Sequence, residues 1–294
     1  MVVHQHGRRR RRTGRVAEAA LAVGLALALA AIGGCGVAGG TGTGTDTGPR
    51  TGGGGDDRAA RDAVRAVRGA ADALTATGSA QTRTAMEMAT GGTRVTIRGE
   101  GGVDFRKRMG RLLVMLPADV TGKPEHRPIT ELLVPGALYM KNRGAGVPDD
   151  KWVRLDTASL ADGNLVTGGA TDPIAAAELL RAARDVTYVG ETEVGGAKVR
   201  HYRGTTDIGQ AARTASPGIK GALEAAAKGF SKDSVPFDAY LDEEGRLRQV
   251  RHRFTYVRNG LIDVSSTTLL YGFGTPVNVV LPPSGDIYAG KIAE

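Results

Sequence analysis

Residues 79–105, which read SAQTRTAMEMATGGTRVTIRGEGGVDF, decide the fold class. Apolar side chains recur here at every second position, and polar or charged residues stand between them. This two-residue period is typical of strands that bury one face. Glycines at 91–92 and at 99, 101 and 102 punctuate the pattern, which therefore predicts antiparallel strands joined by short turns. The apolar residues that share one face are Met86, Met88, Val95, Ile97, Val103 and Phe105.

The same alternation continues through most of the chain. Pro135-Gly136 marks one tight turn, and Asn259-Gly260 is the strongest short hairpin signal in the sequence. About ten or more antiparallel strands are expected, and so wide a sheet is expected to curl because strand twist accumulates. The further strands are predicted at 111–116, 129–134, 137–142, 151–156, 185–191, 198–206, 235–242, 246–257, 261–271 and 277–281.

Helical spacing occurs between these strands. Val64, Val67, Ala71 and Leu74 recur three and four residues apart behind two acids, which predicts an amphipathic helix. The helices are expected at 58–77, from Pro173 onward, at 208–213 and at 218–229. The predicted fold class is therefore α+β: a single large curled antiparallel sheet (half-barrel) with helices covering the concave face. An apolar ligand is expected to sit between sheet and helices.

The N-terminus has the pattern of an export signal. Arginines at 8–12 and 15 precede an apolar run at 19–32, which is shorter than the roughly 20 residues that span a bilayer. Residues 29–35, LAAIGGC, resemble the lipobox of bacterial lipoproteins. Cys35 is expected to accept a thioether-linked diacylglycerol and to become the first mature residue, because two acyl chains give stable anchoring. An ordinary signal peptide with an accidental cysteine is the alternative.

Three segments follow from this reading. Residues 1–34 form the lipoprotein signal peptide, and residues 35–57 form the lipidated cysteine with a flexible tether rich in Gly and Thr. Residues 58–290 form one folded domain, expected on the outer face of the cytoplasmic membrane.

The charge of the chain argues against a nucleic-acid partner. The formal net charge is +8, but six of the 39 basic residues and one of the 31 acidic residues precede Cys35. The mature chain then has 33 basic and 30 acidic residues, a nearly balanced surface. Because Cys35 is the only cysteine, disulfides and Cys-ligated metal sites are excluded.

The sequence contains no recognisable catalytic or metal-binding pattern. His201 lies in a predicted strand without a second histidine nearby, so a structural or surface histidine is favoured over a catalytic one. The acids at 242–244 precede Gly245 between two strands, where they favour a turn over an acid/base pair. No phosphate loop and no nucleophile elbow occurs. We therefore expect no enzyme activity, no cofactor and no metal.

The order of these segments resembles the actinobacterial LppX/LprG-type lipoproteins, which share a half-barrel fold with the lipoprotein carriers LolA and LolB. The resemblance covers residues 79–283 and is one of hairpins and spacing. It rests on the lipobox and on GEGGVDF at 99–105, LYM at 138–140, KWVRL at 151–155, DP at 172–173, VG at 189–190, GG at 195–196, RHY at 200–202, YLDEEGRLR at 240–248 and FGTPV at 273–277.

The resemblance implies a carrier that encloses lipids or lipoproteins in an apolar cavity and moves them through the cell envelope. The six residues on the shared face of 79–105 are the expected cavity lining, and residues 207–234 are expected to act as a mobile lid. The partners are then the membrane, through diacylglyceryl-Cys35, a lipid or other amphipathic ligand, and an envelope protein. The alternatives are an envelope interaction or sensor lipoprotein without lipid cargo, and a hydrolase.

Overall fold

The computed structural model describes residues 53–90, 92–117, 127–143, 146–168, 170–230, 232–257 and 261–290. The predicted signal peptide, Cys35 and the tether up to residue 52 lie outside the described residues. No helix in the described ranges is both long enough and apolar enough to cross a membrane.

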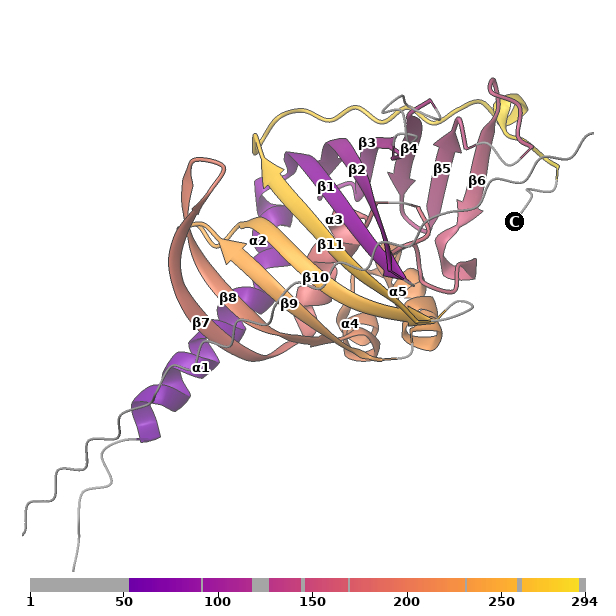
Figure 1. Ribbon diagram of the computed structural model, residues 1–294. Helices are drawn as coiled ribbons and strands as arrows, with labels where there is room; N and C mark the ends of the chain where they lie inside the picture. Colours follow the sequence, from indigo (N-terminus) through magenta and orange to yellow (C-terminus); the bar gives the residue numbers. More distant parts are fainter. Residues whose placement is uncertain are drawn as a thin grey trace, which may run out of the picture. The chain divides into compact units, whose positions relative to one another are not determined.

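The strands form one antiparallel sheet, as predicted (Figure 1). It has 11 strands in the order β6-β5-β4-β3-β2-β1-β11-β10-β9-β8-β7. Strand β1 pairs with β2 on one side and with β11 on the other, so it joins the two halves of the sheet. The strands are β1 Ser79–Thr90, β2 Thr93–Asp104, β3 Met109–Met115, β4 Ile129–Val134, β5 Ala137–Lys141, β6 Trp152–Asp156, β7 Ala183–Val194, β8 Ala197–Asp207, β9 Ser234–Leu241, β10 Leu247–Val257 and β11 Leu261–Tyr271.

The helices lie on one face of the sheet in Figure 1, and we call this face the inner face and the opposite one the outer face. Helix α1 contacts β7, α2 and α3 contact β10, and α4 contacts β8. The α+β class and the single antiparallel sheet are confirmed, while the curl of the sheet stays a prediction. The helices are α1 Gly53–Arg68, α2 Ala70–Thr77, α3 Pro173–Leu179, α4 Ile208–Thr214 and α5 Pro217–Gly229, with short 3₁₀ turns η1 Thr157–Ser159, η2 Leu180–Ala182 and η3 Ser284–Asp286.

The first helix differs from its prediction at both ends. It begins at Gly53, inside the segment assigned to the tether, and Asp56 in its first turn favours a helix N-terminus. The predicted helix at 58–77 is divided at Gly69, although the Gly69 N–H still donates to the Arg65 carbonyl at 3.0 Å. Glycine in a helix interior is a common place for such a break.

Two buried clusters form the core. The larger one joins α1–α5 to the inner face of β1 and β7–β11. The smaller one lies on β2–β5, where Ala170 packs against Ile97, Leu112, Val114 and Leu138. The inner face is therefore covered by helices at one side and by the chain that precedes α3 at the other.

Strand β2 corrects one expectation, because the glycines at 99, 101 and 102 lie inside the strand and do not form a turn. A Cβ atom on Gly101 would lie 1.9 Å from the carbonyl oxygen of Arg111 in β3. Glycine inside a strand permits such a close backbone approach. The turn between β1 and β2 lies at Gly92, with φ of 86°, as predicted for 91–92.

The predicted strand at 277–281 is wrong. Residues 275–283 have no regular structure, and Val280 is 72% exposed. Both sides of β1 and β11 are already paired, so the segment has no free neighbouring strand there. Prolines at 276, 282 and 283 also lack the N–H that pairing needs.

Gly101→Ala is expected to destabilise the fold, because its methyl group would overlap the Arg111 carbonyl oxygen. Overpacking that forces the backbone to shift costs about 1–3 kcal/mol. Denaturant unfolding of the full chain measures the loss. Gly285→Ala is the matched control, since no atom lies within 4 Å of its added methyl group. Equal stability of the two variants would contradict the close approach.

Candidate functional site

The six residues predicted to line a cavity all lie on the inner face. Met86, Val103 and Phe105 belong to the larger core cluster, and Ile97 belongs to the smaller one. Met88 is partly buried against both clusters, and Val95 is partly buried against the smaller one. The structure thus brings these residues to one side of the sheet as core residues, and their contact with a ligand stays a proposal.

Sequence analysis missed a row of polar side chains on this face, which we call the inner polar strip: Thr82, Thr84, His252, Ser266 and Thr268. Register places Thr84 opposite Thr268, and Ser266 opposite both Met86 and His252. All five side chains are buried. The Ser266 hydroxyl lies 2.5 Å from the Thr171 hydroxyl, which in turn donates to the Leu165 carbonyl.

The other members of the strip have polar atoms without a hydrogen-bond partner among the described residues. The hydroxyls of Thr82, Thr84 and Thr268 and the Nε2 atom of His252 make no hydrogen bond to any described residue. Burial lowers the pKa of His252 to about 3, so its ring is neutral at pH 7. Most buried polar groups in folded proteins have a partner, so these atoms need an explanation.

A second group of partnerless polar atoms lies beside β4. Glu131 is fully buried, and neither carboxyl oxygen has a partner among the described residues. The amide of Asn164 is only 2% exposed and is also without a partner there. A Cβ atom on Gly168 would lie 2.7 Å from Asn164 Oδ1 and 3.3 Å from Glu131 Oε1, so the two side chains converge on this glycine.

Burial controls the ionisation of Glu131. Burial, and to a smaller extent the negative charge of Asp172, raise the pKa of Glu131, Arg143 opposes them, and the net result is a pKa of about 8. At neutral pH the carboxyl group is thus mainly protonated and can donate a hydrogen bond. Together with the neutral His252, it gives the inner face uncharged polar groups within an apolar wall. Such a surface fits an amphipathic molecule with hydroxyl or ester groups.

His201 has the structural setting that the sequence favoured. Its Nε2 atom lies 2.8 Å from Asp238 Oδ1 on the outer face, and its ring stacks on Tyr240 at 4.4 Å. Arg203 and Arg253 also donate to Asp238, at 3.0 and 2.6 Å. Burial raises the pKa of Asp238, but the hydrogen bonds from Arg253, His201 and Arg203 outweigh it and lower the pKa to about 2.

The turn predicted at 242–244 is also present. Asp242 accepts hydrogen bonds from the backbone N–H and the Nε of Arg246, and Gly245 has a φ of 75°. The acids thus shape the β9–β10 turn, as expected. In the part of the chain that the structure describes, no group of three or more His, Cys, Asp or Glu side chains is arranged to hold a metal ion.

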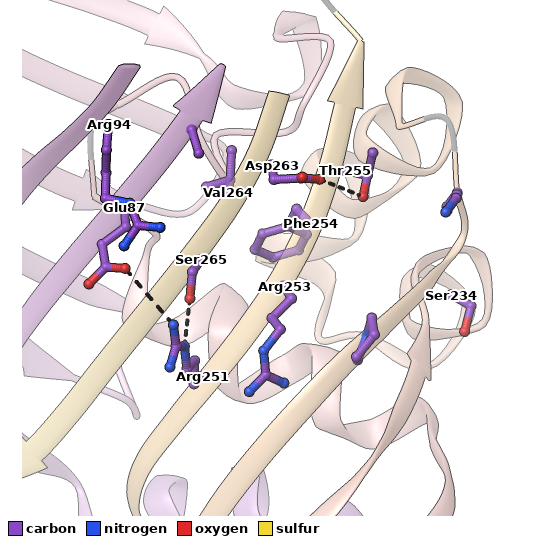
Figure 2. Close-up of a pocket in the computed structure, with 13 residues that line it drawn as sticks. Glu87, Arg94, Ser234, Arg251, Arg253, Phe254, Thr255, Asp263, Val264 and Ser265 are labelled. Carbon is purple, nitrogen blue, oxygen red and sulfur yellow. Dashed lines mark hydrogen bonds and ion pairs between the residues drawn. The ribbon is translucent and has the colours of Figure 1, made fainter. Parts of the chain in front are cut away.

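The outer face carries an open pocket of about 550 Å³, which we call the outer pocket (Figure 2). In Figure 2, Arg251 lies between Glu87 and Ser265 and contacts both. The pocket lies near the ends of β1, β10 and β11. Its lining residues are Glu87, Ala89, Arg94, Lys232, Ser234, Pro236, Arg251, Arg253, Phe254, Thr255, Asp263, Val264 and Ser265, which include none of the six predicted lining residues.

Glu131→Gln is expected to change how stability depends on pH. Folded Glu131 keeps its proton up to a pKa of about 8, whereas the unfolded side chain loses it near 4.5. The folded state therefore binds more protons in this window, and the wild type loses stability as the pH rises through it. Glutamine does not titrate, so the free energy of unfolding of the variant should rise relative to that of the wild type.

Urea unfolding at several pH values between these two pKa values measures the difference. Glu224→Gln, at an exposed position on α5, is the control and should follow the wild type at every pH. Stability curves for Glu131→Gln that run parallel to the wild type would contradict the buried, protonated carboxyl group.

No protein-family model and no curated protein matches the sequence. The chain is structurally similar to lipoprotein LppX from Mycobacterium tuberculosis, with a TM-score of 0.47 and 12% identity over 75% of this chain and 99% of that chain. For LprF from Mycobacterium bovis the TM-score is 0.42 and the sequence identity 13%, over 76% of this chain and 97% of that chain. For a LolA superfamily protein from Nitrosomonas europaea the TM-score is 0.33 and the sequence identity 9%, over 71% of this chain and 91% of that chain. The chain is thus similar in structure to LppX, LprF and a LolA-superfamily protein at low sequence identity.

Proposed function

We propose that this chain is an exported lipoprotein that binds lipids or other amphipathic ligands in the cell envelope and transfers them. Diacylglyceryl-Cys35 anchors it to the outer face of the cytoplasmic membrane, and residues 35–57 link the anchor to the domain. The ligand lies between the inner face and the helices. The observation that carries this proposal is the set of buried polar atoms on an otherwise apolar face that have no hydrogen-bond partner among the described residues.

The inner polar strip and Glu131 carry an energetic cost when no ligand is bound. Each buried polar group without a hydrogen bond costs about 1–3 kcal/mol. Ester or hydroxyl groups of a ligand, or water that enters with it, would supply the missing hydrogen bonds. An acyl chain beside them gains about 0.8 kcal/mol for each methylene that leaves water. Binding then requires burial alone, with no catalytic step.

The helices that cover the inner face can separate from it at a small cost in free energy. Seven of the 14 buried positions in α3, α4 and α5 are alanine, and the free energy of burial scales with apolar area. Small side chains therefore hold α4 and α5 less tightly than leucines would. The alanines are Ala175, Ala176 and Ala177 of α3, Ala211 and Ala212 of α4, and Ala222 and Ala226 of α5. We propose that residues 207–234 act as a lid over the ligand.

The alternative function is an interaction or sensor lipoprotein without lipid cargo. One observation favours it: Tyr188 and Val189 are 48% and 50% exposed on β7, at the edge of the sheet. Exposed apolar side chains on an edge strand fit a protein partner. Such a protein would contain no bound lipid.

Native mass spectrometry of the membrane-extracted full chain, released from a nonionic detergent, separates the two functions. The lipid-carrier proposal predicts one covalent diacylglycerol and an additional non-covalent lipid mass. Cys35→Ser should lose the covalent mass and keep the non-covalent one, since the ligand site lies in the folded domain. A wild-type spectrum with the covalent lipid alone would contradict lipid carriage and favour the interaction module.

A disulfide between Gly221→Cys and Ala158→Cys tests the lid. A Cβ atom on Gly221 would lie 3.3 Å from the Ala158 Cβ, close to the ~3.5–4.5 Å of a disulfide. The oxidised double variant should take up pyrene-labelled phosphatidylcholine from mixed micelles at least about ten times more slowly than wild type, because α5 cannot move away from η1.

Reduction of the disulfide should restore uptake, and the single Gly221→Cys variant is the control. Cys35 is the only native cysteine and is blocked by its lipid in this proposal, so the engineered pair has no competing thiol. Unchanged uptake by the oxidised variant would exclude α5 as the lid.

A further inference from the structure

The outer pocket has a floor of small side chains and a rim of cations. Strand pairing places Ala89 beside Asp263 in one row, and Ser265 between Glu87 and Arg253 in the next. Ala89 and Ser265 are short, so the surface is hollow between the longer side chains. Arg94 from β2 and Arg251 and Arg253 from β10 stand around this hollow (Figure 2). Lys232, which precedes β9, also lines the pocket.

Two of the cations are held in place by the protein. The Nε atom of Arg251 donates to the Ser265 hydroxyl at 2.6 Å, and its Nη2 atom lies 3.9 Å from Glu87. Arg253 donates to Asp238 at 2.6 Å. A guanidinium group carries five N–H donors, so each arginine keeps donors for a further acceptor. These contacts hold the two arginines at the pocket and leave N–H donors of each guanidinium group for a ligand.

The other two cations lack a partner. Neither Arg94 nor Lys232 makes a hydrogen bond or an ion pair with a described residue, although both line the same pocket as Arg251 and Arg253. The carboxylates in the lining are Glu87, which faces Arg251, and Asp263, which accepts from the Thr255 hydroxyl at 3.4 Å. Four cations thus line the pocket against the lining carboxylates Glu87 and Asp263 and against Asp238, which holds Arg253 from outside the pocket. The positive charge that remains attracts an anion.

We propose that the outer pocket binds a phosphate group, on the opposite face of the sheet from the proposed lipid site. Guanidinium forks match the oxygens of phosphate in bidentate geometry, and an ammonium group adds a point charge. Arg251 and Arg253 supply pre-oriented donors, while Arg94 and Lys232 close on the anion from the sides. The phosphate belongs either to a phospholipid headgroup or to a free phosphate.

Isothermal titration calorimetry of the full chain in dodecyl maltoside tests the site with two probes. One is inorganic phosphate, and the other is phosphatidylglycerol in mixed micelles, with phosphatidylcholine as the comparison lipid. At least one anionic probe should bind with a Kd of about 1 mM or tighter. Comparable Kd values for both anions assign the pocket to phosphate itself, and at least about ten-fold tighter binding of phosphatidylglycerol assigns it to a headgroup.

Three variants locate the binding. Arg94→Ala with Lys232→Ala should weaken it at least about ten-fold, because it removes the two cations that have no partner among the described residues. Asp263→Asn should tighten it, since a repulsive carboxylate is lost. Arg154→Ala with Lys198→Ala removes the same charge at exposed positions outside the pocket and should leave the Kd within about two-fold.

Circular dichroism and thermal unfolding of each variant confirm that the fold is retained. Absence of binding by both anionic probes would overturn the proposal, and so would equal weakening by the two double variants. Equal binding of phosphatidylcholine and phosphatidylglycerol micelles, with none of inorganic phosphate and no loss in Arg94→Ala with Lys232→Ala, would also overturn it, because the lipids would then bind at the inner face alone.

Discussion

The pairing of β1 with β11 holds the two halves of the structure together. Residues from Gln81 to Ala89 pair with residues from Tyr271 to Asp263, far along the chain. This pairing joins β2–β6 to β7–β10 in one sheet and places Met86 and Thr84 beside Ser266 and Thr268. Closing so long a loop costs entropy before any contact forms, so the core clusters on the inner face must compensate for it.

On the inner face, the side chains that would serve ligand binding differ from those that would make the fold most stable. A face selected only for stability would carry apolar side chains throughout, because partnerless buried polar groups are unfavourable. Here Thr82, Thr268, His252 and Glu131 interrupt the apolar surface without partners among the described residues. Local rules of folding are often broken at functional sites. The outer face differs, since charged side chains there pair with each other around Asp238 and accumulate as cations at the outer pocket.

The alternation of apolar and polar residues in 79–105 predicted the fold class, because successive side chains of a strand point to opposite faces of the sheet. It could not place the glycines at 99, 101 and 102, since the close approach of Gly101 to Arg111 depends on a neighbouring strand. The pattern at 277–281 fitted a strand, but β1 and β11 offer no free side for it to pair with. Nor could spacing show that Glu131 and Asn164 both approach Gly168, which lies in the chain before α3. The threonines at 82 and 84 were visible at alternate positions, yet their burial required the register with β11.

The most direct test for a lipid site between the sheet and the helices is photo-crosslinking with a diacyl lipid that carries a diazirine near the end of one acyl chain. After irradiation of the loaded full chain, peptide mass spectrometry locates the adducts. The account predicts adducts on inner-face residues such as Met86 and Met88 and on the facing alanines of α3–α5. Adducts confined to the outer face or to the chain ends, or none at all, would contradict a lipid site between the sheet and the helices.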